Sequence, residues 1–244
     1  MESAKEQAVS NAVASAEIEG LHPTEQDIAR IRDFLDNRIS HDELVAMAIY
    51  DISGTRADCY PNTTVLINRF HIQDQKKLST VEQKLVTSLA AQLEAETVFE
   101  HVDFAYYKGL HKALFGDLYD WAGTVRTIPI SKKGTVFCPA EEISGIAEAR
   151  FLRLKQQNYL TGLDDKAFLE ELTGLYDDLN LLHPFRDGNG RTLRLFITLL
   201  VKNTGRRALF GRCDANLLAS AAIQAAQGKK DLLRQALSEV IVNG

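Results

Sequence analysis

The residues best suited to chemistry lie in one run, His183-Pro-Phe-Arg-Asp-Gly-Asn-Gly-Arg-Thr-Leu-Arg194. Gly188 and Gly190 flank Asn189, and glycines let the backbone adopt positive φ and turn its amide donors toward one point. The apolar residues that follow predict a helix, whose N-terminus adds positive potential. The run therefore predicts an anion cradle of the kind that binds phosphate groups.

Charged and titratable side chains surround this cradle. Arg191 and Arg194 lie in the first turn of the predicted helix, so both guanidinium groups can reach a bound phosphate. Asp187 offers a hard oxygen ligand to Mg²⁺, which commonly binds one or two carboxylates together with phosphate oxygens. The ordinary pKa of histidine, about 6.5, suits His183 to proton removal near neutral pH. Together these residues indicate attack of a protein hydroxyl on a nucleotide phosphate.

Helices must position this loop. Apolar residues three and four apart predict an amphipathic helix over Asp165–Leu182, and Thr192–Val201 is apolar on nearly all sides, as in a buried central helix. We also expect a helix over 3–18, a second that begins near residue 24, and another over 103–114. Two capping boxes each predict the start of a further helix: Ser40–Glu43, and Ser79–Glu82, whose helix runs to about residue 95.

Two β-prone runs predict a hairpin, which is the only β-structure that the sequence indicates. They are Val125–Ile130 and Thr135–Cys138, separated by a turn at Lys132–Gly134. Pro129 confines its strand to an edge. Turn-forming residues between 51 and 73 place a domain boundary near residue 55.

Composition limits the class of protein. The chain has 244 residues and a net charge of −5, which fits one large domain, or a domain with a small appendage, and disfavours direct nucleic-acid binding. No apolar run approaches the roughly 20 residues of a membrane span, and the N-terminus lacks a secretory signal pattern. Three scattered cysteines indicate neither a disulfide framework nor a zinc site. We therefore expect a cytoplasmic protein.

The remaining histidines show no metal-ligand spacing and are expected on the surface or in the core: His22, His41, His71, His101 and His111.

The run from His183 to Arg194 resembles the signature of Fic-domain proteins, His-x-Phe-x-(Asp/Glu)-Gly-Asn-Gly-Arg-x-x-Arg, at every specified position. The resemblance extends through Tyr60-Pro-Asn62, Phe115–Gly123 and the hairpin. It implies a mainly α, Fic (Fido) helical fold with a small β-hairpin flap. It also implies transfer of AMP from ATP to a Ser, Thr or Tyr hydroxyl of a target protein.

The resemblance assigns roles by position. His183 would be the general base, Asp187 the Mg²⁺ ligand and Phe185 a core anchor of the loop. The anion hole would comprise Gly188, Asn189 and Gly190, with Asn189 bonded to the α-phosphate, Arg191 to the distal phosphates and Arg194 to the γ-phosphate. Family members with lysine in place of Gly190 can act as kinases, so the glycine here favours AMP transfer.

The hairpin would be a flap that pairs with an extended segment of the target by strand addition. The docking residues would be Ile128, Ile130, Lys132, Lys133 and Val136.

Ser15 and Glu19 belong to a second pattern, Ser15-Ala-Glu-Ile-Glu-Gly20, which resembles the Fic inhibitory pattern (Ser/Thr)-x-x-x-Glu-(Gly/Asn). Residues 9–48 are similar to the small three-helix antitoxins that some Fic toxins carry as a separate chain. We therefore divide the chain into an antitoxin-like inhibitory module, 1–54, and a Fic catalytic domain, 55–244. Glu19 would pair with Arg194 and occupy the place of the γ-phosphate, while Ser15 would orient the inhibitory helix.

Other functions stay open. The same site could remove AMP from a modified protein, or transfer UMP or phosphocholine. A non-enzymatic alternative is a nucleotide-sensing or DNA-binding regulator built on helices around 217–240, although its basic cluster is small. The resemblance makes a type II topoisomerase subunit the first candidate target, and a homo-oligomer is compatible with the sequence.

Overall fold

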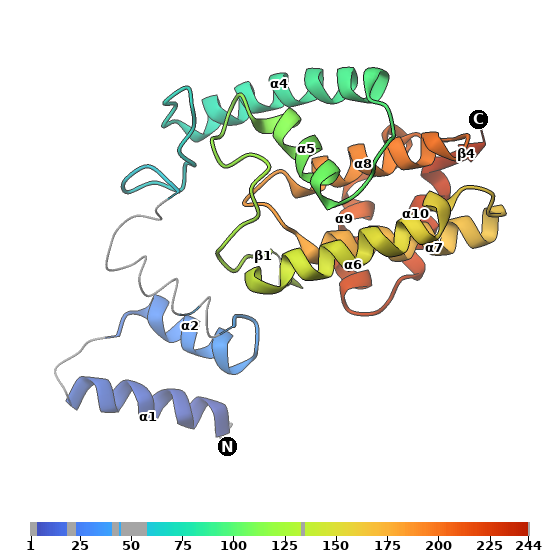
Figure 1. Ribbon diagram of the computed structural model, residues 1–244. Coiled ribbons are helices and arrows are strands. Elements are labelled where there is room, and N and C mark those ends of the chain that lie inside the picture. The colour runs from blue at the N-terminus through green and yellow to red at the C-terminus, as the bar shows by residue number, and fades with distance from the viewer. Residues whose placement is uncertain (1–3, 19–22, 41–43, 45–57, 133–134, 244) are drawn as a thin grey trace.

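The computed structural model describes all residues except 1–3, 19–22, 41–43, 45–57, 133–134 and 244. The described chain is mainly helical, as predicted (Figure 1). Its α-helices are α1 (Ala4–Ile18), α2 (Glu25–Leu35), α4 (Gln75–Glu96), α5 (Phe104–Phe115), α6 (Ile143–Gln156), α7 (Asp165–Leu182), α8 (Asn189–Asn203), α9 (Ala215–Ala226) and α10 (Asp231–Val240). Short 3-10 turns occur at Ala140–Glu142, Asn158–Leu160 and Phe210–Arg212. The strands are β1 (Ser131–Lys132), β2 (Thr135–Val136), β3 (Arg206–Ala208) and β4 (Ile241–Asn243).

Helix α8 lies at the centre of the helical body (Figure 1). Helices α4, α5 and α7 pack against it, and α9 and α10 cover α7. Every residue from Leu195 to Val201 is buried, which confirms the prediction of a central helix. Because α8 is enclosed along this length, its first turn is held rigidly in the surrounding helices. That turn carries the second half of the predicted phosphate loop.

Helix α4 begins earlier than predicted. The side chain of Asp74 accepts a hydrogen bond of 2.8 Å from the backbone N–H of Lys77, so Asp74 is the N-cap. The predicted capping box at Ser79–Glu82 was wrong, because those residues already lie inside the helix. An aspartate cap followed by good helix formers outweighs the later serine. This leaves the carboxylate of Glu82 available for tertiary contacts.

The other helices flanking the site follow the sequence closely. Helix α7 has the predicted bounds, with Asp164 accepting from the N–H of Ala167 as its N-cap. Helix α5 begins after Asp103, whose side chain accepts from the N–H of Tyr106. Local caps and apolar spacing therefore decide these boundaries.

The hairpin is shorter than predicted. Ser131 pairs with Val136 and Lys132 with Thr135, whereas the predicted strand Val125–Ile130 was wrong. Pro129 has no N–H to donate to a ladder, and the side chain of Arg126 takes the carbonyl of Ile128. A second small sheet, in which β3 pairs antiparallel with β4, also corrects the expectation that the hairpin is the only β-structure. Its strands come from distant segments, so no local alternation signals them.

Helices α1 and α2 pack on each other and are tied by ion pairs. Arg32 lies 3.0 Å from Glu6, and Lys5 lies 2.7 Å from Asp36. The predicted third helix of this module, its Ser40–Glu43 capping box and the boundary near 55 fall largely outside the described residues. The division at residues 54 and 55 stays a prediction.

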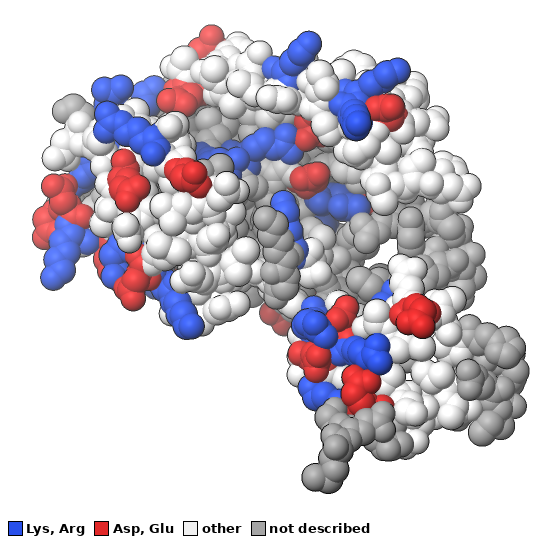
Figure 2. Space-filling model, turned by 180° about the vertical axis from the view of Figure 1, so that it is seen from behind, with Lys and Arg blue, Asp and Glu red and all other residues white. Residues whose placement is uncertain are grey.

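Charges of both signs cover the surface. Figure 2 shows Lys and Arg side chains gathered in a hollow at the centre of one face, beside a few acidic side chains. Within the described part of the chain, no helix has both the length and the hydropathy that crossing a bilayer requires.

Candidate active site

The predicted loop connects the end of α7 to the start of α8. His183 is the C-cap of α7 and has left-handed backbone angles, with φ of 41° and ψ of 59°. A residue other than glycine is rarely found in this region, and the surroundings must hold it there. Its carbonyl oxygen accepts a hydrogen bond of 2.8 Å from Nε of Arg126. The loop therefore begins at a strained position that the hairpin segment supports.

The ring of His183 has a defined proton arrangement. Nδ1 lies 3.1 Å from the carbonyl oxygen of Asn180. A carbonyl oxygen only accepts, so Nδ1 carries the proton and Nε2 keeps its lone pair. The ring of Phe137 stacks on the imidazole with a centroid separation of 3.7 Å. Burial lowers the pKa of His183 to about 4, so the ring is neutral at pH 7 and can take a proton at Nε2.

Phe185 anchors the loop in the core, as predicted, since its side chain is fully buried. The side chain of Asn189 forms two hydrogen bonds with the backbone of Phe185: Phe185 N–H donates to Asn189 Oδ1 at 2.8 Å, and Asn189 Nδ2 donates to the Phe185 carbonyl at 2.7 Å. The amide group predicted to reach the α-phosphate is thus occupied inside the loop in this structure. The backbone donors of the first turn of α8 remain for an anion.

Glycine is needed at positions 188 and 190 of the loop for different reasons. Gly188 has a φ of 78°, and a Cβ there would lie 2.5 Å from the ring of Phe115. A Cβ on Gly190 would lie 3.2 Å from Nη1 of Arg194. The first glycine is therefore demanded by backbone angle and packing, and the second leaves room for the arginine.

A cavity of about 580 Å³ opens between α4 and α8, at the side of the loop that carries both predicted phosphate-binding arginines. Its charged lining residues are Glu82, Glu94, Arg191 and Arg194, and its apolar lining includes Val86, Ala90, Leu195 and Phe210. The volume is in the range of small-molecule sites. The structure thus brings Arg191 and Arg194 to one hollow.

Sequence reasoning missed Glu82, which lines this hollow, and Tyr119, which binds the carboxylate of Glu82. Nη1 of Arg191 lies 2.6 Å from Oε1 of Glu82, and the hydroxyl of Tyr119 donates to Oε2 of the same carboxylate. The guanidinium of Arg191 also stacks over the ring of Phe115. Nothing in the local sequence signals these contacts, because Glu82 lies in α4, Arg191 in α8 and Tyr119 in the segment after α5.

Asp187 lies at the solvent edge of the loop. Its side chain is 55% exposed, and Oδ1 accepts from the N–H of Gly188. An accessible carboxylate beside a phosphate cradle is the donor set that Mg²⁺ uses when phosphate oxygens complete its shell. Among the described residues, no group of three or more His, Cys, Asp or Glu side chains could hold a metal by itself.

His111 contacts the loop, a role that sequence reasoning did not assign to it. It is fully buried, and its Nε2 lies 2.9 Å from the carbonyl oxygen of Asp187, while the N–H of Gly123 donates to Nδ1 at 2.9 Å. Its ring stacks on Phe185 with centroids 3.8 Å apart. His111 is the satisfied core residue expected above, yet it joins α5 directly to the loop.

The hairpin presents apolar side chains to solvent. Ile128 and Val136 are 37% and 45% exposed, Lys132 is exposed, and Ile130 is partly buried. Lys133 lies outside the described residues. Of the predicted inhibitory pair, Glu19 also lies outside them, and only the backbone of Ser15, within α1, is described.

Comparison with known proteins supports the family resemblance. Residues 101–201 match the model of the Fic/DOC family. The chain is 34% identical over 187 residues to protein adenylyltransferase VbhT of Bartonella schoenbuchensis, covering 75% of this chain and 39% of that protein. It is 38% identical over 148 residues to probable protein adenylyltransferase y4lH of Sinorhizobium fredii, covering 60% of this chain and 76% of that protein.

The chain thus spans well under half of VbhT but most of y4lH. Among solved structures, the BepC effector protein of Bartonella tribocorum with bound AMPPNP superposes with a TM-score of 0.72 at 25% identity. The match covers 78% of this chain and 99% of that chain. The predicted mainly helical fold with a small hairpin is confirmed.

Proposed function

We propose that this chain, which belongs to the Fic/DOC family, transfers the AMP group of ATP to a Ser, Thr or Tyr hydroxyl of a target protein. The names of the relatives VbhT and y4lH, and the AMPPNP bound to BepC, support the reaction and its nucleotide. One observation carries the proposal: His183, whose Nδ1 proton is held by the carbonyl of Asn180 so that Nε2 is unprotonated, is joined by the loop to the helix N-terminus that carries Arg191 and Arg194.

The reaction makes one bond and breaks another. The target hydroxyl oxygen bonds to the α-phosphorus, the bond from that phosphorus to the α,β-bridging oxygen breaks, and pyrophosphate leaves with the electron pair. The hydroxyl proton passes to Nε2 of His183. Backbone N–H groups of Gly188, Asn189 and Gly190, with the dipole of α8, would stabilise the charge that develops on the α-phosphate, once Oδ1 of Asp187 releases the N–H of Gly188.

The two arginines bind the rest of the triphosphate, Arg191 at the distal phosphates and Arg194 at the γ-phosphate. Asp187 would hold a Mg²⁺ ion, consistent with its exposed carboxylate. Bound Mg²⁺ would neutralise phosphate charge and help to orient the leaving group.

The hairpin is the docking edge for the target. Ile128 and Val136 expose apolar surface there, while Ile130, Lys132 and Lys133 complete the set. An extended target segment adds to this edge through main-chain hydrogen bonds, which aligns its hydroxyl with the α-phosphorus. Main-chain pairing accepts many sequences, so a type II topoisomerase subunit is proposed as a target only from the family resemblance.

The N-terminal module inhibits AMP transfer in this proposal. Glu19 would pair with Arg194 at the place of the γ-phosphate, and Ser15 would orient the helix that delivers it. Arg194 lines the open cavity beside α4, so a carboxylate entering that hollow competes directly with a phosphate. In this proposal the chain is a self-inhibited, antitoxin-fused enzyme, and the cytoplasm is its proposed place of action.

The test uses the full chain, ATP labelled at the α-phosphate and a bacterial lysate. Glu19→Gly should raise labelling of a protein band strongly, and Glu17→Gly, which removes the same charge nearby, should match wild type. Adding His183→Ala to Glu19→Gly should abolish labelling while an ATP analogue still binds. Labelled UTP and CDP-choline run in parallel. Label from those alone, or label that survives loss of His183, would overturn the proposal.

A further inference from the structure

Arg126 lies at the base of the hairpin with only 5% of its surface exposed. Its guanidinium donates to three backbone carbonyl oxygens. Nε lies 2.8 Å from that of His183, Nη1 lies 2.8 Å from that of Ile128, and Nη2 lies 2.5 Å from that of Cys138. Each nitrogen has its own acceptor, so one planar group holds three chain segments in a set geometry.

Two backbone hydrogen bonds reinforce the same junction. The N–H of Arg126 donates to the carbonyl of Pro184 at 2.8 Å, and the N–H of Cys138 donates to that of Leu181 at 3.0 Å. Both arms of the hairpin are therefore attached to the end of α7 and the start of the catalytic loop. A shift of either arm must be felt at His183.

The contact falls at a position where the backbone needs support. His183 has the left-handed φ of 41° described above, which a residue with a Cβ adopts only when its surroundings enforce it. The Nε of Arg126 holds the carbonyl of this residue, and a hydrogen bond from a charged donor is stronger than one between neutral groups. The orientation of the base thus depends on the side chain that also sets the hairpin.

We propose that Arg126 is a positioning residue that couples docking of the target strand on the hairpin to the orientation of His183. The inference rests on the proposed AMP transfer and on the hairpin as its docking edge. An added strand orders the arms that contain Ile128 and Cys138. Through its hydrogen bond to the carbonyl of His183, Arg126 then fixes the backbone of the base. The base is therefore held in position for proton removal while the target is bound.

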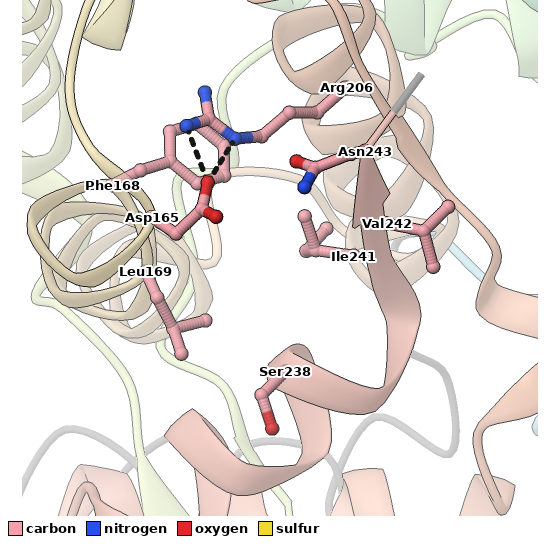
Figure 3. Close-up of a pocket in the computed structure, with 8 residues that line it drawn as sticks. All are labelled: Asp165, Phe168, Leu169, Arg206, Ser238, Ile241, Val242 and Asn243. Carbon is pink, nitrogen blue, oxygen red and sulfur yellow. Dashed lines mark hydrogen bonds and ion pairs between the residues drawn. The ribbon is translucent and has the colours of Figure 1, made fainter.

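Arg206 provides a matched control. Its side chain is 13% exposed, and its Nη2 donates to the carbonyl of Leu163 at 2.9 Å and to Asp165 at 2.8 Å. Its guanidinium lies over the ring of Phe168 (Figure 3). Arg206 lines a cavity of about 300 Å³. Asp165 is the first residue of α7 and His183 follows its last, so Arg206 ties the opposite end of the same helix.

The experiment compares Arg126→Met, Arg126→Lys and Arg206→Met, all in the full chain with Glu19→Gly. The lysine variant keeps the charge but offers one nitrogen to three acceptors, and thermal melting confirms that each variant folds. Hydrogen exchange is measured for peptides covering 127–138 and 179–186. AMP transfer is measured as the rate of labelling of the protein band in the lysate. Nucleotide binding is measured as the Kd for a non-hydrolysable ATP analogue.

Both Arg126 variants should speed exchange in both segments together, and should lower transfer about 100-fold, as expected for a misplaced base, with the Kd for the analogue unchanged. Arg206→Met should leave the hydrogen exchange of both segments and the rate of transfer unchanged. Faster exchange in the hairpin alone, or transfer at the parent rate, would overturn the coupling. If no protein is labelled even by the parent chain, the proposed function fails, and the exchange data still decide whether Arg126 joins the two segments.

Discussion

The ring of Phe137 lies almost parallel to that of His183, with centroids 3.7 Å apart and planes 11° from each other. Phe137 follows β2 in the hairpin, whereas His183 ends α7. A segment proposed to bind the target therefore forms one wall around the proposed base. Burial, to which this ring contributes, is the main reason why the pKa of His183 is lowered to about 4.

Removing this wall should shift the pH dependence of transfer. The base acts when neutral, so the rate rises with pH through the pKa of His183. Phe137→Ala admits water and moves that pKa from about 4 toward the ordinary value of about 6.5, so the acid limb moves to higher pH.

The measurement is the pH profile of kcat/KM between pH 4 and 8, read for shape and not amplitude. Phe137→Leu keeps the apolar cover and should keep the wild-type limb. The other groups around the ring, Arg126, Lys132, Asp187 and the carbonyl of Asn180, are the same in both variants. An unchanged limb in Phe137→Ala would contradict the assignment of the wall or of the base.

Glu82 should weaken the binding of ATP. Its carboxylate already occupies Arg191, which the proposed mechanism assigns to the distal phosphates. Glu82→Gln removes this competing charge and should tighten the Kd for a non-hydrolysable analogue about fivefold, or about 1 kcal/mol for a partly exposed pair. Titration calorimetry measures the change.

Glu94→Gln removes the same charge from the lining of the same cavity and should leave the Kd near wild type. Weaker binding by Glu82→Gln would show the opposite role, in which Glu82 orients Arg191 for the nucleotide.

His111 should make the fold sensitive to acid. Burial lowers the pKa of this histidine to about 4, below the ordinary value of about 6.5 in the unfolded chain. The unfolded state then binds more protons, so stability is present above pH 6.5 and is lost as pH falls toward 4, by about 3 kcal/mol in all.

His111→Gln does not titrate and should lose this dependence, although it is less stable at pH 7. Urea unfolding at pH 7 and pH 4.5 gives the difference, with both chains carrying His183→Ala so that the second buried histidine does not contribute. Equal pH slopes in the two chains would contradict the lowered pKa.

Gly188 should tolerate no side chain. Its φ of 78° is unfavourable for alanine, and the new Cβ would lie 2.5 Å from the ring of Phe115. Gly205 has a φ of 80° with nothing within 4 Å of its Cβ position, so Gly205→Ala isolates the cost of the backbone angle.

We expect Gly205→Ala to cost about 1 kcal/mol and Gly188→Ala at least about 3 kcal/mol in the free energy of unfolding, because overpacking adds to the strain. Denaturant unfolding measures both. Similar losses in the two variants would mean that the ring of Phe115 moves aside freely.

The sequence indicated a large part of this architecture. The bounds of α7 and the buried character of α8 follow from apolar spacing within a short stretch of chain, and the anchoring of Phe185 was implied by the family resemblance. The sequence misplaced the start of α4, where Asp74 outcompetes Ser79, and it lengthened the hairpin, where Arg126 and Pro129 interrupt the ladder. Local propensity cannot weigh one cap against another, or see a side chain that takes a strand's carbonyl.

By itself, the sequence determined the order of chemical groups in the loop, because His183, Asp187 and the two arginines are neighbours along the chain. Only the tertiary structure decided what surrounds them. His111 reaches the carbonyl of Asp187 across 76 positions, and Arg126 reaches that of His183 across 57. Glu82 meets Arg191 because α4 packs on α8. Buried donors and acceptors must find partners wherever packing brings them, and packing joins residues that no local pattern connects.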